Sequence, residues 1–470
     1  MPVPVITVPQ MRAWESATWA SGQTEAEVIR RVGKRIAKRV RKLTRAADAI
    51  LILAGKGNNG ADARAAAEFL DERKVEIHEV ASPAGDLPKL QELLEKDFAL
   101  IVDGLFGIGL DRPLDDGWQK IVAAVNASHI PVLAIDVPSG LNCESGEPMG
   151  AAIQASLTLT VGAPKTGMLA QSAWPFVGRL EVLDSVGLVP CPVKSEVNWT
   201  LPDDFKNFPP ARSVAAHKGS FGHLAIVAGS SGFHGAAVLA AKGAQRAQPG
   251  LITLFPQEAS YYPIASQLQS PMVSVWKPDA KQFDKASAIL FGPGLAAPDV
   301  PDDLKNIVRR LWRDFPHPII ADANAMDWIP AQALPKSLIR VVTPHPGEAA
   351  RMVGSNTQKV QSTRVQTLRE ISRRYGNCWV VLKGHQTLVG RSEGEVFTNP
   401  SGNPHLAQGG SGDVLSGLIA GFLAQPELQP EAGQAIRCAV WRHGNAADEL
   451  QSEGGNWVIE DLLEELGKAP

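Results

Sequence analysis

A glycine-rich stretch that could hold a phosphoryl group occupies residues 402–417, GNPHLAQGGSGDVLSG, directly before the apolar segment LIAGFLA. We expect a helix to begin near Asp413. Backbone N–H groups and the positive end of the helix dipole make such a start attractive to anions. A carboxylate beside this hole can accept a proton from an attacking hydroxyl, as the catalytic aspartate does in kinases. Asp413 is therefore either the base of a phosphoryl transfer or a helix cap.

Three apolar runs in the first half also end in residues that could do chemistry. Residues 55–62, GKGNNGAD, follow AILILA and open a helix, so they form either an anion cradle or a simple turn. Asp103 ends FALIVD, and Asp136 ends VLAID three residues before Ser139. A buried carboxylate is costly unless it is paired or binds a cation, and oxygen ligands suit alkali or alkaline-earth ions. The alternative is that both aspartates cap the following turns.

The second half has further polar groups after apolar runs. GHLAIVAGSSG and ILFGPGL end in glycine-rich turns, and VVTPHPGE places His345 and Glu348 between a strand and a helix. A histidine at this position is either structural or catalytic. Glu348 can serve simply as a negative charge in the first helical turn.

All these residues need a scaffold that brings strand ends together. From residue 49 onward, short apolar runs alternate with helical segments such as 116–127, a pattern typical of a mainly parallel sheet covered on both faces. Ligands bind such sheets beyond the carboxyl ends of the strands. The alternation stops over residues 189–212, which hold five prolines, and then resumes. We therefore predict an α/β protein whose two domains meet near residue 205.

Length, charge and cysteine content narrow the class of protein. The chain has 470 residues, more than one hydrophobic core usually organises, so at least two domains are expected. A net charge of −3 argues against a general nucleic-acid binder, and the lack of an 18-residue apolar run argues against a membrane protein. The four cysteines form no CxxC pair, which favours structural thiols in a cytoplasmic protein.

One local stretch is strongly basic. Residues 30–45, RRVGKRIAKRVRKLTR, carry nine Lys and Arg, while Ile29, Val32, Ile36, Val40 and Leu43 recur at helical spacing. We interpret this as an amphipathic helix with a solvated basic face. An anionic partner or membrane surface is the alternative.

The motifs, taken in order, resemble those of a known family. They are GKGNNG, VDGLFGIGL and DVPSGLN, then HKGSFG, GSSGFHGAA, FGPGL, ADAN, TPHPGE, VLKG and NPSGNPHLAQGGSGDVLSG. Together they are similar to the bifunctional NAD(P)H-hydrate repair enzymes over nearly the whole chain. The resemblance implies a Rossmann-like three-layer NAD(P)H-hydrate epimerase domain over residues 1–205. It implies a ribokinase-like, ADP-dependent (S)-NAD(P)H-hydrate dehydratase domain over residues 206–470.

The resemblance also implies roles for particular residues. Catalytic roles would fall to Asp136 in the epimerase and to Asp413 in the dehydratase. The epimerase would bind the hydrate through Asn58, Asn59, Gly60, Ala61, Asp62, Gly107, Ile108, Gly109, Leu110, Asp111, Arg112, Pro113 and Asp136, and potassium through Asn59, Asp103 and Ser139. The dehydratase would bind the hydrate through Ala236, Gly294, His345 and Asp413, the adenine nucleotide through Lys383, Gly384, His385, Gln386, Thr387 and Gly412, and magnesium with help from Glu348.

The family's chemistry transfers a phosphoryl group from ADP to the C6 hydroxyl of the hydrate and then expels phosphate. The expected partners are therefore the small molecules NAD(P)HX and ADP, with K⁺ and Mg²⁺, and the protein is expected to be a homo-oligomer. The alternative is a ribokinase-like small-molecule kinase with a non-catalytic nucleotide-binding N-terminal domain.

The chain departs from the family pattern in the first half. Ala61 and Ala63 stand in NNGADA where the family usually has NNGGDG, and Asn142 stands where an aspartate is common. If either missing glycine is left-handed, alanine would cost about 1 kcal/mol there.

Overall fold

The computed structural model describes residues 2–296, 298 and 300–468. It forms two compact units, Val3–Ser195 and the chain from Glu196 onward. The division lies within the proline-rich segment but earlier than residue 205, because β8 (Val197–Trp199) pairs in parallel with β17 (Val396–Thr398) of the second unit. No helix among the described residues is long and apolar enough to cross a membrane.

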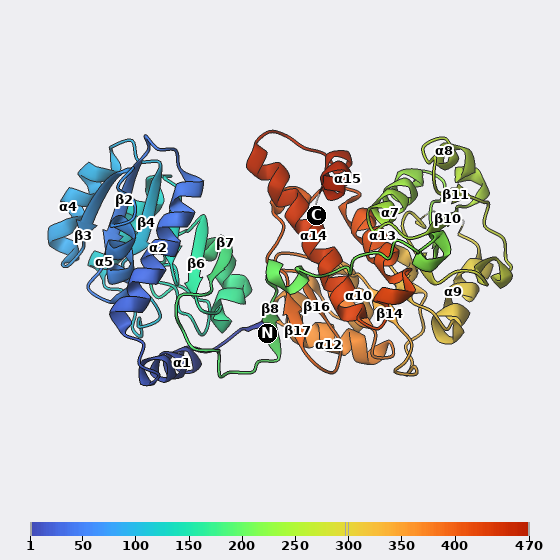
Figure 1. Ribbon diagram of the computed structural model, residues 1–470, viewed down its shortest axis with the longest axis horizontal. Coiled ribbons are helices and arrows are strands. Elements are labelled where there is room, and N and C mark those ends of the chain that lie inside the picture. Colours follow the sequence, from blue (N-terminus) through green and yellow to red (C-terminus); the bar gives the residue numbers. More distant parts are fainter. Residues whose placement is uncertain (1, 297, 299, 469–470) are drawn as a thin grey trace. The chain divides into compact units, whose positions relative to one another are not determined.

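The first unit is built on a sheet in which every neighbouring pair of strands is parallel (Figure 1). The strand order is β3-β2-β4-β5-β6-β7. The strands are β2 (Ala49–Ala54), β3 (Lys74–Glu79), β4 (Leu100–Gly104), β5 (Val132–Ile135), β6 (Leu157–Val161) and β7 (Arg179–Leu183). From β2 the chain passes first to β3 on one side and then to β4 on the other. A ligand site is expected at this switch between β2 and β4.

Helices cover both faces of the first sheet. Successive residues of β2 point to opposite faces, so Ile50 and Ile52 pack in one apolar core with α2 and α3, while Leu51 and Leu53 pack in another with α4 and α5. The remaining elements of the unit are β1 (Val3–Pro4), α1 (Val8–Ala20), α2 (Glu25–Leu43), α3 (Asn58–Ala67), α4 (Pro83–Leu94), α5 (Asp116–Ala127) and α6 (Trp174–Val177).

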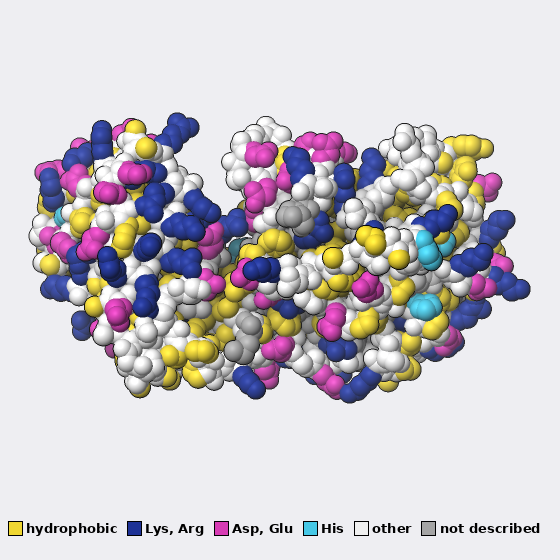
Figure 2. All heavy atoms as spheres, in the orientation of Figure 1, with side chains coloured by type: hydrophobic (Ala, Val, Ile, Leu, Met, Phe, Trp, Pro, Cys, Tyr) yellow, Lys and Arg dark blue, Asp and Glu magenta, His cyan; other side chains and the backbone are white. Residues whose placement is uncertain are grey.

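The predicted basic helix is α2, with its basic residues on the outer face (Figure 2). Its buried residues include Val28, Val32, Ile36 and Val40, whereas Leu43 is 43% exposed. The buried face therefore begins one residue earlier than the sequence predicted and ends at Val40, three residues before the end of the helix.

The second unit is also a covered, mostly parallel sheet. From β8 the order is β8-β17-β16-β15-β14-β13-β12-β9-β10-β11, and only β16 pairs antiparallel with its neighbours among the described strands. The strands not yet given are β9 (His223–Val227), β10 (Leu251–Phe255), β11 (Met272–Val273), β12 (Ala288–Phe291), β13 (Ile319–Ala321), β14 (Arg340–Val342), β15 (Trp379–Leu382) and β16 (Leu388–Gly390).

Alternate residues of β9 again serve two cores. Leu224 and Ile226 pack with α7 and α13, and Ala225 and Val227 pack with α9 and α12. The helices of this unit are α7 (His234–Arg246), α8 (Tyr261–Ala265), α9 (Asp302–Asp314), α10 (Pro346–Val353), α11 (Thr357–Ser362), α12 (Arg364–Arg374), α13 (Ser411–Leu423), α14 (Ala432–Glu453) and α15 (Ile459–Lys468).

Helices α7 and α13 approach each other closely at two glycines of α13. A Cβ atom added at Gly417 would lie 2.0 Å from the carbonyl oxygen of Ala240, and one added at Gly421 would lie 2.6 Å from that of Ala244. Glycine is required at both positions because no larger residue fits between the two backbones. The position of α13 is thus set by direct backbone packing on α7.

Candidate active sites

A cavity of about 790 Å³ in the first unit is lined by residues that follow β2, β4 and β5. Of the predicted hydrate-binding residues, its lining includes Asn58, Asn59, Asp62, Gly107, Ile108, Gly109, Leu110, Asp111, Arg112 and Asp136. Gly60, Ala61 and Pro113 are not among the described residues that line it. Gly60 instead packs against the preceding turn, where an added Cβ atom would lie 1.9 Å from the carbonyl oxygen of Gly55.

Three residues with oxygen-bearing side chains gather at the ends of the central strands. The Ser139 hydroxyl donates to Asp103 Oδ1 at 2.6 Å, and the Ser139 backbone N–H donates to Asp103 Oδ2 at 2.8 Å. Asn59 Nδ2 donates to the carbonyl oxygens of Phe106 and Ile135, each at 2.7 Å. Burial raises the pKa of Asp103, although the hydrogen bonds from Ser139 oppose that rise. The three residues predicted to hold potassium are thus brought together.

Asp136 pairs with a buried lysine. Lys165 Nζ lies 2.5 Å from Asp136 Oδ1, and the Lys165 side chain is fully buried. The backbone N–H of Val161 donates to the same carboxylate oxygen at 3.0 Å, and the Thr160 hydroxyl donates at 3.2 Å. Asp136 has a left-handed φ of 62°, which an aspartate adopts only where its surroundings hold it.

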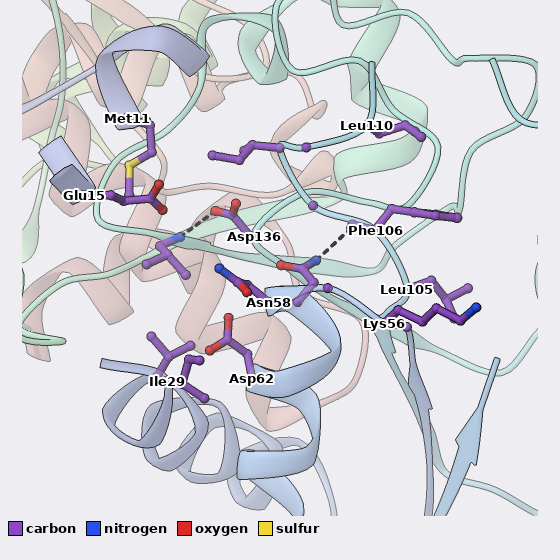
Figure 3. Close-up of a pocket in the computed structure, with 18 of the residues that line it drawn as sticks. Met11, Glu15, Ile29, Lys56, Asn58, Asp62, Leu105, Phe106, Leu110 and Asp136 are labelled. Atoms are coloured by element: carbon purple, nitrogen blue, oxygen red, sulfur yellow. Dashed lines mark hydrogen bonds between the residues drawn. The ribbon is translucent and has the colours of Figure 1, made fainter. Parts of the chain in front are cut away.

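Two more carboxyl groups face the same cavity (Figure 3). Burial, followed by the charges of Asp136, Glu15 and Glu25, raises the pKa of Asp62 well above its ordinary value. Burial and then Asp136 also raise the pKa of Glu15. Acidic groups therefore concentrate at one end of the cavity.

The departures from the family pattern are accommodated locally. Ala61 and Ala63 lie inside α3 and neither has a positive φ, so the condition for backbone strain is not met. Alanine is the residue that helices favour most. Asn142 Oδ1 accepts hydrogen bonds from the backbone N–H groups of Glu144 and Ser145, both at 2.9 Å, which a carboxylate could equally accept.

The second unit places its candidate residues directly after strands. Asp322 follows β13, His345 lies three residues after β14, and Lys383 follows β15. Gly294 lies three residues after β12, and a Cβ atom added there would be 3.1 Å from Ala236 Cβ at the start of α7. The two predicted hydrate contacts Ala236 and Gly294 are therefore neighbours.

Lys383 is surrounded by carboxylates. Its Nζ atom lies 3.3 Å from Asp322 Oδ1 and 3.9 Å from Glu348 Oε2. The Thr343 hydroxyl donates to Asp322 Oδ1 at 2.6 Å and fixes that carboxylate from the neighbouring strand end. Burial lowers the pKa of Lys383, but Asp322 and Glu348 outweigh this effect and leave it raised. The amine is therefore held charged.

Asp413 lies in the first turn of α13, which begins at Ser411 after the left-handed Gly410. The N-cap residue is Gly410, which has no side chain to cap the helix, and Asp413 is the acidic residue of the first turn. Burial, then the charge of Asp322, raises the pKa of Asp413 to about 7, against the opposing charge of Lys383. A Cβ atom added at Gly412 would lie 3.3 Å from Lys383 Nζ, which places the lysine beside the glycine loop.

His345 and Glu348 form a capping box at α10. His345 Nδ1 accepts hydrogen bonds from the N–H groups of Gly347 at 3.0 Å and Glu348 at 3.3 Å. In return, Glu348 Oε2 accepts the N–H of His345 at 2.8 Å. Both side chains thus have a structural role, with the His345 ring still exposed and Glu348 buried.

Arg364 on α12 positions the predicted nucleotide loop at residues 383–387. Its guanidinium donates to the carbonyl oxygens of His385 at 2.6 Å, Leu382 at 3.2 Å and Gln386 at 3.3 Å. Burial lowers the pKa of Arg364 to about 10, so the group remains charged at neutral pH. The Thr387 hydroxyl closes the loop by donating to the Gly384 carbonyl at 3.0 Å.

Two family models match this chain. The model for NAD(P)H-hydrate dehydratase covers residues 224–468, and the model described as YjeF-related protein N-terminus covers residues 25–90 and 80–167. The bifunctional NAD(P)H-hydrate repair enzyme of Coxiella burnetii is 34% identical over 473 residues, covering 95% of this chain and 94% of that protein. The chain belongs to the bifunctional NAD(P)H-hydrate repair enzyme family.

Other relatives agree with this placement in the NAD(P)H-hydrate repair family. The bifunctional NAD(P)H-hydrate repair enzyme of Escherichia coli is 29% identical and covers 86% of this chain and 81% of that protein. A solved ribokinase-like protein from Enterococcus faecalis covers 59% of this chain and 96% of its own, with a TM-score of 0.51 and 23% identity. The α/β fold with a Rossmann-like first half and a ribokinase-like second half is confirmed.

Sequence reasoning missed several polar residues at the two candidate sites of this repair-family chain. They are Glu15, Lys165, Asp322, Arg364 and His443, whose neutral ring contacts the Ser411 carbonyl at 3.1 Å and whose pKa burial lowers to about 4. Lys165 and Asp322 follow apolar runs, so the rule that located Asp103 could have found them. Glu15 and Arg364 lie on helices far away in sequence, and no local pattern marks them.

Proposed function

We propose that this protein repairs hydrated nicotinamide cofactors. It epimerises R and S NAD(P)HX and dehydrates the S form to NAD(P)H, with ADP as phosphoryl donor and AMP and phosphate as products. The first unit, Val3–Ser195, would carry the epimerase, and the chain from Glu196 onward the dehydratase. The observation that carries the proposal is the grouping of Asp413, Lys383 and the glycine loop at the start of α13.

In the dehydratase, Asp413 accepts the proton of the C6 hydroxyl as that oxygen attacks the terminal phosphoryl group of ADP. The Lys383 ammonium and the backbone N–H groups at the start of α13 stabilise the charge on the transferred group. The phosphorylated hydrate then loses phosphate and its C5 proton, which restores the dihydronicotinamide. A pKa of about 7 suits Asp413 to this role, because a general base works best near the ambient pH.

Magnesium is the second component of the proposed dehydratase site. Glu348 is a buried hard-oxygen donor 3.9 Å from Lys383 Nζ, so it can contribute to a Mg²⁺ site beside the nucleotide. The ion would neutralise negative charge on the phosphates of the bound ADP. Glu348 then serves both the helix cap and the ion.

Potassium is proposed for the epimerase half. The donor set there is the Asp103 carboxylate, the Ser139 hydroxyl, the Asn59 amide oxygen and the Phe106 carbonyl, which are hard oxygen ligands within one hydrogen-bonded cluster. The described residues contain no group of three or more His, Cys, Asp and Glu suited to a metal. Largely neutral oxygen ligands of this kind fit an alkali cation. Asp103→Ala should raise the potassium concentration needed for R-hydrate conversion.

Purified R and S hydrates test the whole proposal. With ADP, both should recover dihydronicotinamide absorbance, whereas without ADP neither should. Asp136→Asn should abolish conversion of the R hydrate and leave S-hydrate dehydration intact. Equal loss of both activities in this variant would contradict the assignment of one reaction to each unit.

The choice of nucleotide has its own test. We propose that ADP supports dehydration better than ATP at matched concentration, as the resemblance implies. A faster initial rate with ATP would contradict this part of the proposal.

We further propose a cytoplasmic homo-oligomer. All four cysteines are free thiols, and a reducing compartment preserves such thiols. Soluble oligomers are most often homo-oligomers with closed symmetry. Sedimentation of the purified protein and fractionation of cells would test the two statements.

A further inference from the structure

Asp62 is a buried carboxyl group for which the contacts among the described residues give no structural role. It is 8% exposed, lies on the second turn of α3 and lines the 790 Å³ cavity. Its Oδ1 atom is buried and has no hydrogen-bond partner among the described residues. An isolated carboxylate in such a place is costly, and the cost falls when the group carries a proton.

The groups around Asp62 favour its protonated form. Glu25 on α2, Glu15 on α1 and Asp136 after β5 all act on it as negative charges, and burial adds to their effect on its pKa. Glu25 is held in place by Asn58 Nδ2, which donates to its carboxylate at 2.6 Å. The cationic residues that line the cavity are Arg12, Lys56 and Arg112, and none of them contributes to the pKa of Asp62.

Asp136 has the opposite environment. The Lys165 ammonium and the Val161 N–H both bind one of its oxygens, which stabilises the ionised carboxylate. Figure 3 shows the carboxyl groups of Asp62, on α3, and Asp136, after β5, facing the same space from different elements. A pair of carboxyl groups in contrasting environments is a recurring arrangement for one acid and one base.

We propose that Asp62 is the general acid of the epimerase and Asp136 its general base. This inference rests on the proposed function and adds a second catalytic residue to it. Inversion at C6 needs two proton transfers, since one hydroxyl must leave and another must arrive on the opposite face.

The proton and electron balance closes with these two groups. Asp62 gives its proton to the C6 hydroxyl while the C6–O bond breaks and water leaves. The lone pair of the ring nitrogen forms a double bond to C6. A second water then bonds to C6 from the other face and gives one proton to Asp136. Water in the cavity returns that proton to Asp62, so nothing is consumed.

The first experiment compares Asp62→Asn with the wild-type full-length protein. The amide keeps the size of the side chain but cannot supply the proton, so R-hydrate conversion should fall at least a hundredfold. Dehydration of the S hydrate with ADP should be unchanged, and the midpoint of thermal unfolding should not fall, because the amide removes a carboxyl group whose pKa is raised by folding. Asp71→Asn, the same change at an exposed position outside the cavity, is the matched control and should keep full activity.

The pH dependence of R-hydrate conversion distinguishes a catalytic role of Asp62 from a structural one. An acid must be protonated to act, so wild-type kcat/KM for the R hydrate should fall as the pH rises through the raised pKa of Asp62. This alkaline limb should be absent from the residual rate of Asp62→Asn. Retention of more than about a tenth of the rate, or the same alkaline limb in both proteins, would overturn the proposal.

Oxygen exchange tests the two-water step on the wild-type protein alone. Conversion in H₂¹⁸O should place one labelled oxygen at C6 for each inversion, whereas retention of ¹⁶O would overturn the scheme. A wild-type protein that does not convert the R hydrate at all would instead contradict the proposed function itself.

Discussion

Each unit places a lysine beside an aspartate at the carboxyl edge of its sheet, fully buried in the first unit and partly buried in the second, and the lysine pairs differently in the two. In the first unit Lys165 binds Asp136 directly, 2.5 Å from its oxygen. In the second unit Lys383 binds Asp322, and Asp413 in the next helix keeps a pKa near 7. The aspartate after β5 is therefore paired directly with its lysine, whereas in the second unit the lysine pairs with Asp322 and Asp413 keeps a pKa of about 7.

The difference shows how a protein sets protonation through the choice of partner. Burial raises the pKa of a carboxyl group, and a close cation or hydrogen bonds to the ionised form lower it. In the first unit the acid has to be a different residue, because Asp136 is committed to its lysine. In the second unit Lys383 pairs with Asp322, which leaves Asp413 without a direct cationic partner, as the proposed role of a base requires.

The largest expected effect concerns the carboxyl group without a direct partner. Asp413→Asn removes the proton acceptor of phosphoryl transfer, so ADP-dependent dehydration of the S hydrate should fall by about 10² to 10⁴. ADP binding, measured by calorimetry, should remain nearly normal because the backbone N–H groups of the loop are intact. If the variant retained more than about a tenth of the wild-type turnover, Asp413 would not be the base of the phosphoryl transfer.

The stability of the same variant sharpens this test. The pKa of Asp413 is higher in the folded than in the unfolded chain, so the native protein loses stability as the pH rises from about 4 to about 7. Asp413→Asn removes this loss and should unfold at a higher temperature than wild type at pH 8. A helix cap would instead lose about 1 kcal/mol on this substitution.

The directly paired lysine should matter mainly for folding. Lys165→Met leaves the Asp136 carboxylate buried without its cation, which should lower the free energy of unfolding by about 3 to 5 kcal/mol. Adding Asp136→Asn should recover a large part of that loss, because the lone charge is then gone. Additive losses in the double variant, measured by urea unfolding, would show that the pair is not coupled.

A smaller effect should appear in the pH profile of dehydration. A base must be ionised, so kcat/KM for the S hydrate should rise with pH through about 7 and then level off. The negative charge of Asp322 helps to raise the pKa of Asp413, and Lys383 and Glu348 are the other charges that act on it. Asp322→Asn should therefore move the rising limb to lower pH. A shift to higher pH would contradict the assigned pairing.

The smallest effect tests a position where the first unit differs from the family pattern. Ala63 is fully buried inside α3, so Ala63→Gly loses a favourable helix residue and one buried methyl group. We expect the free energy of unfolding to fall by about 1 to 2 kcal/mol, with R-hydrate conversion retained. Thermal unfolding and the R-hydrate assay measure the two outcomes, and a gain in stability would show that alanine is strained there.

The positions of candidate site residues could be predicted from the sequence where a reactive side chain directly follows a strand or adjoins a glycine loop. Asp103, Asp136 and Asp413 stand directly beside apolar runs or a glycine loop, and parallel strands bring their ends together. The alternation of runs predicted the two covered sheets, and the proline-rich segment marked the division between units.

The remaining features depend on tertiary packing. Arg364 reaches the nucleotide loop from a helix, and Glu15 reaches the first cavity from α1, so neither follows from local spacing. The pairing of Lys383 with Asp322 could not be predicted, because both residues and Asp413 follow separate elements. The sequence shows which charged groups meet at an edge, but only the folded arrangement decides which of them form pairs.

The close approach of α7 and α13 at Gly417 and Gly421 makes catalysis sensitive to a substitution far from the candidate site. Gly421 lies eight residues after Asp413, about 12 Å along the helix axis. A methyl group added there would force α13 away from α7, since its carbon would meet Ala244 and Ala247 within 2.7 Å. Because a helix moves largely as a rigid rod, the shift would also displace its first turn, which holds Asp413, the proposed base. Gly417 and Gly421 should therefore tolerate no larger residue, although they lie on α13 away from the glycine loop.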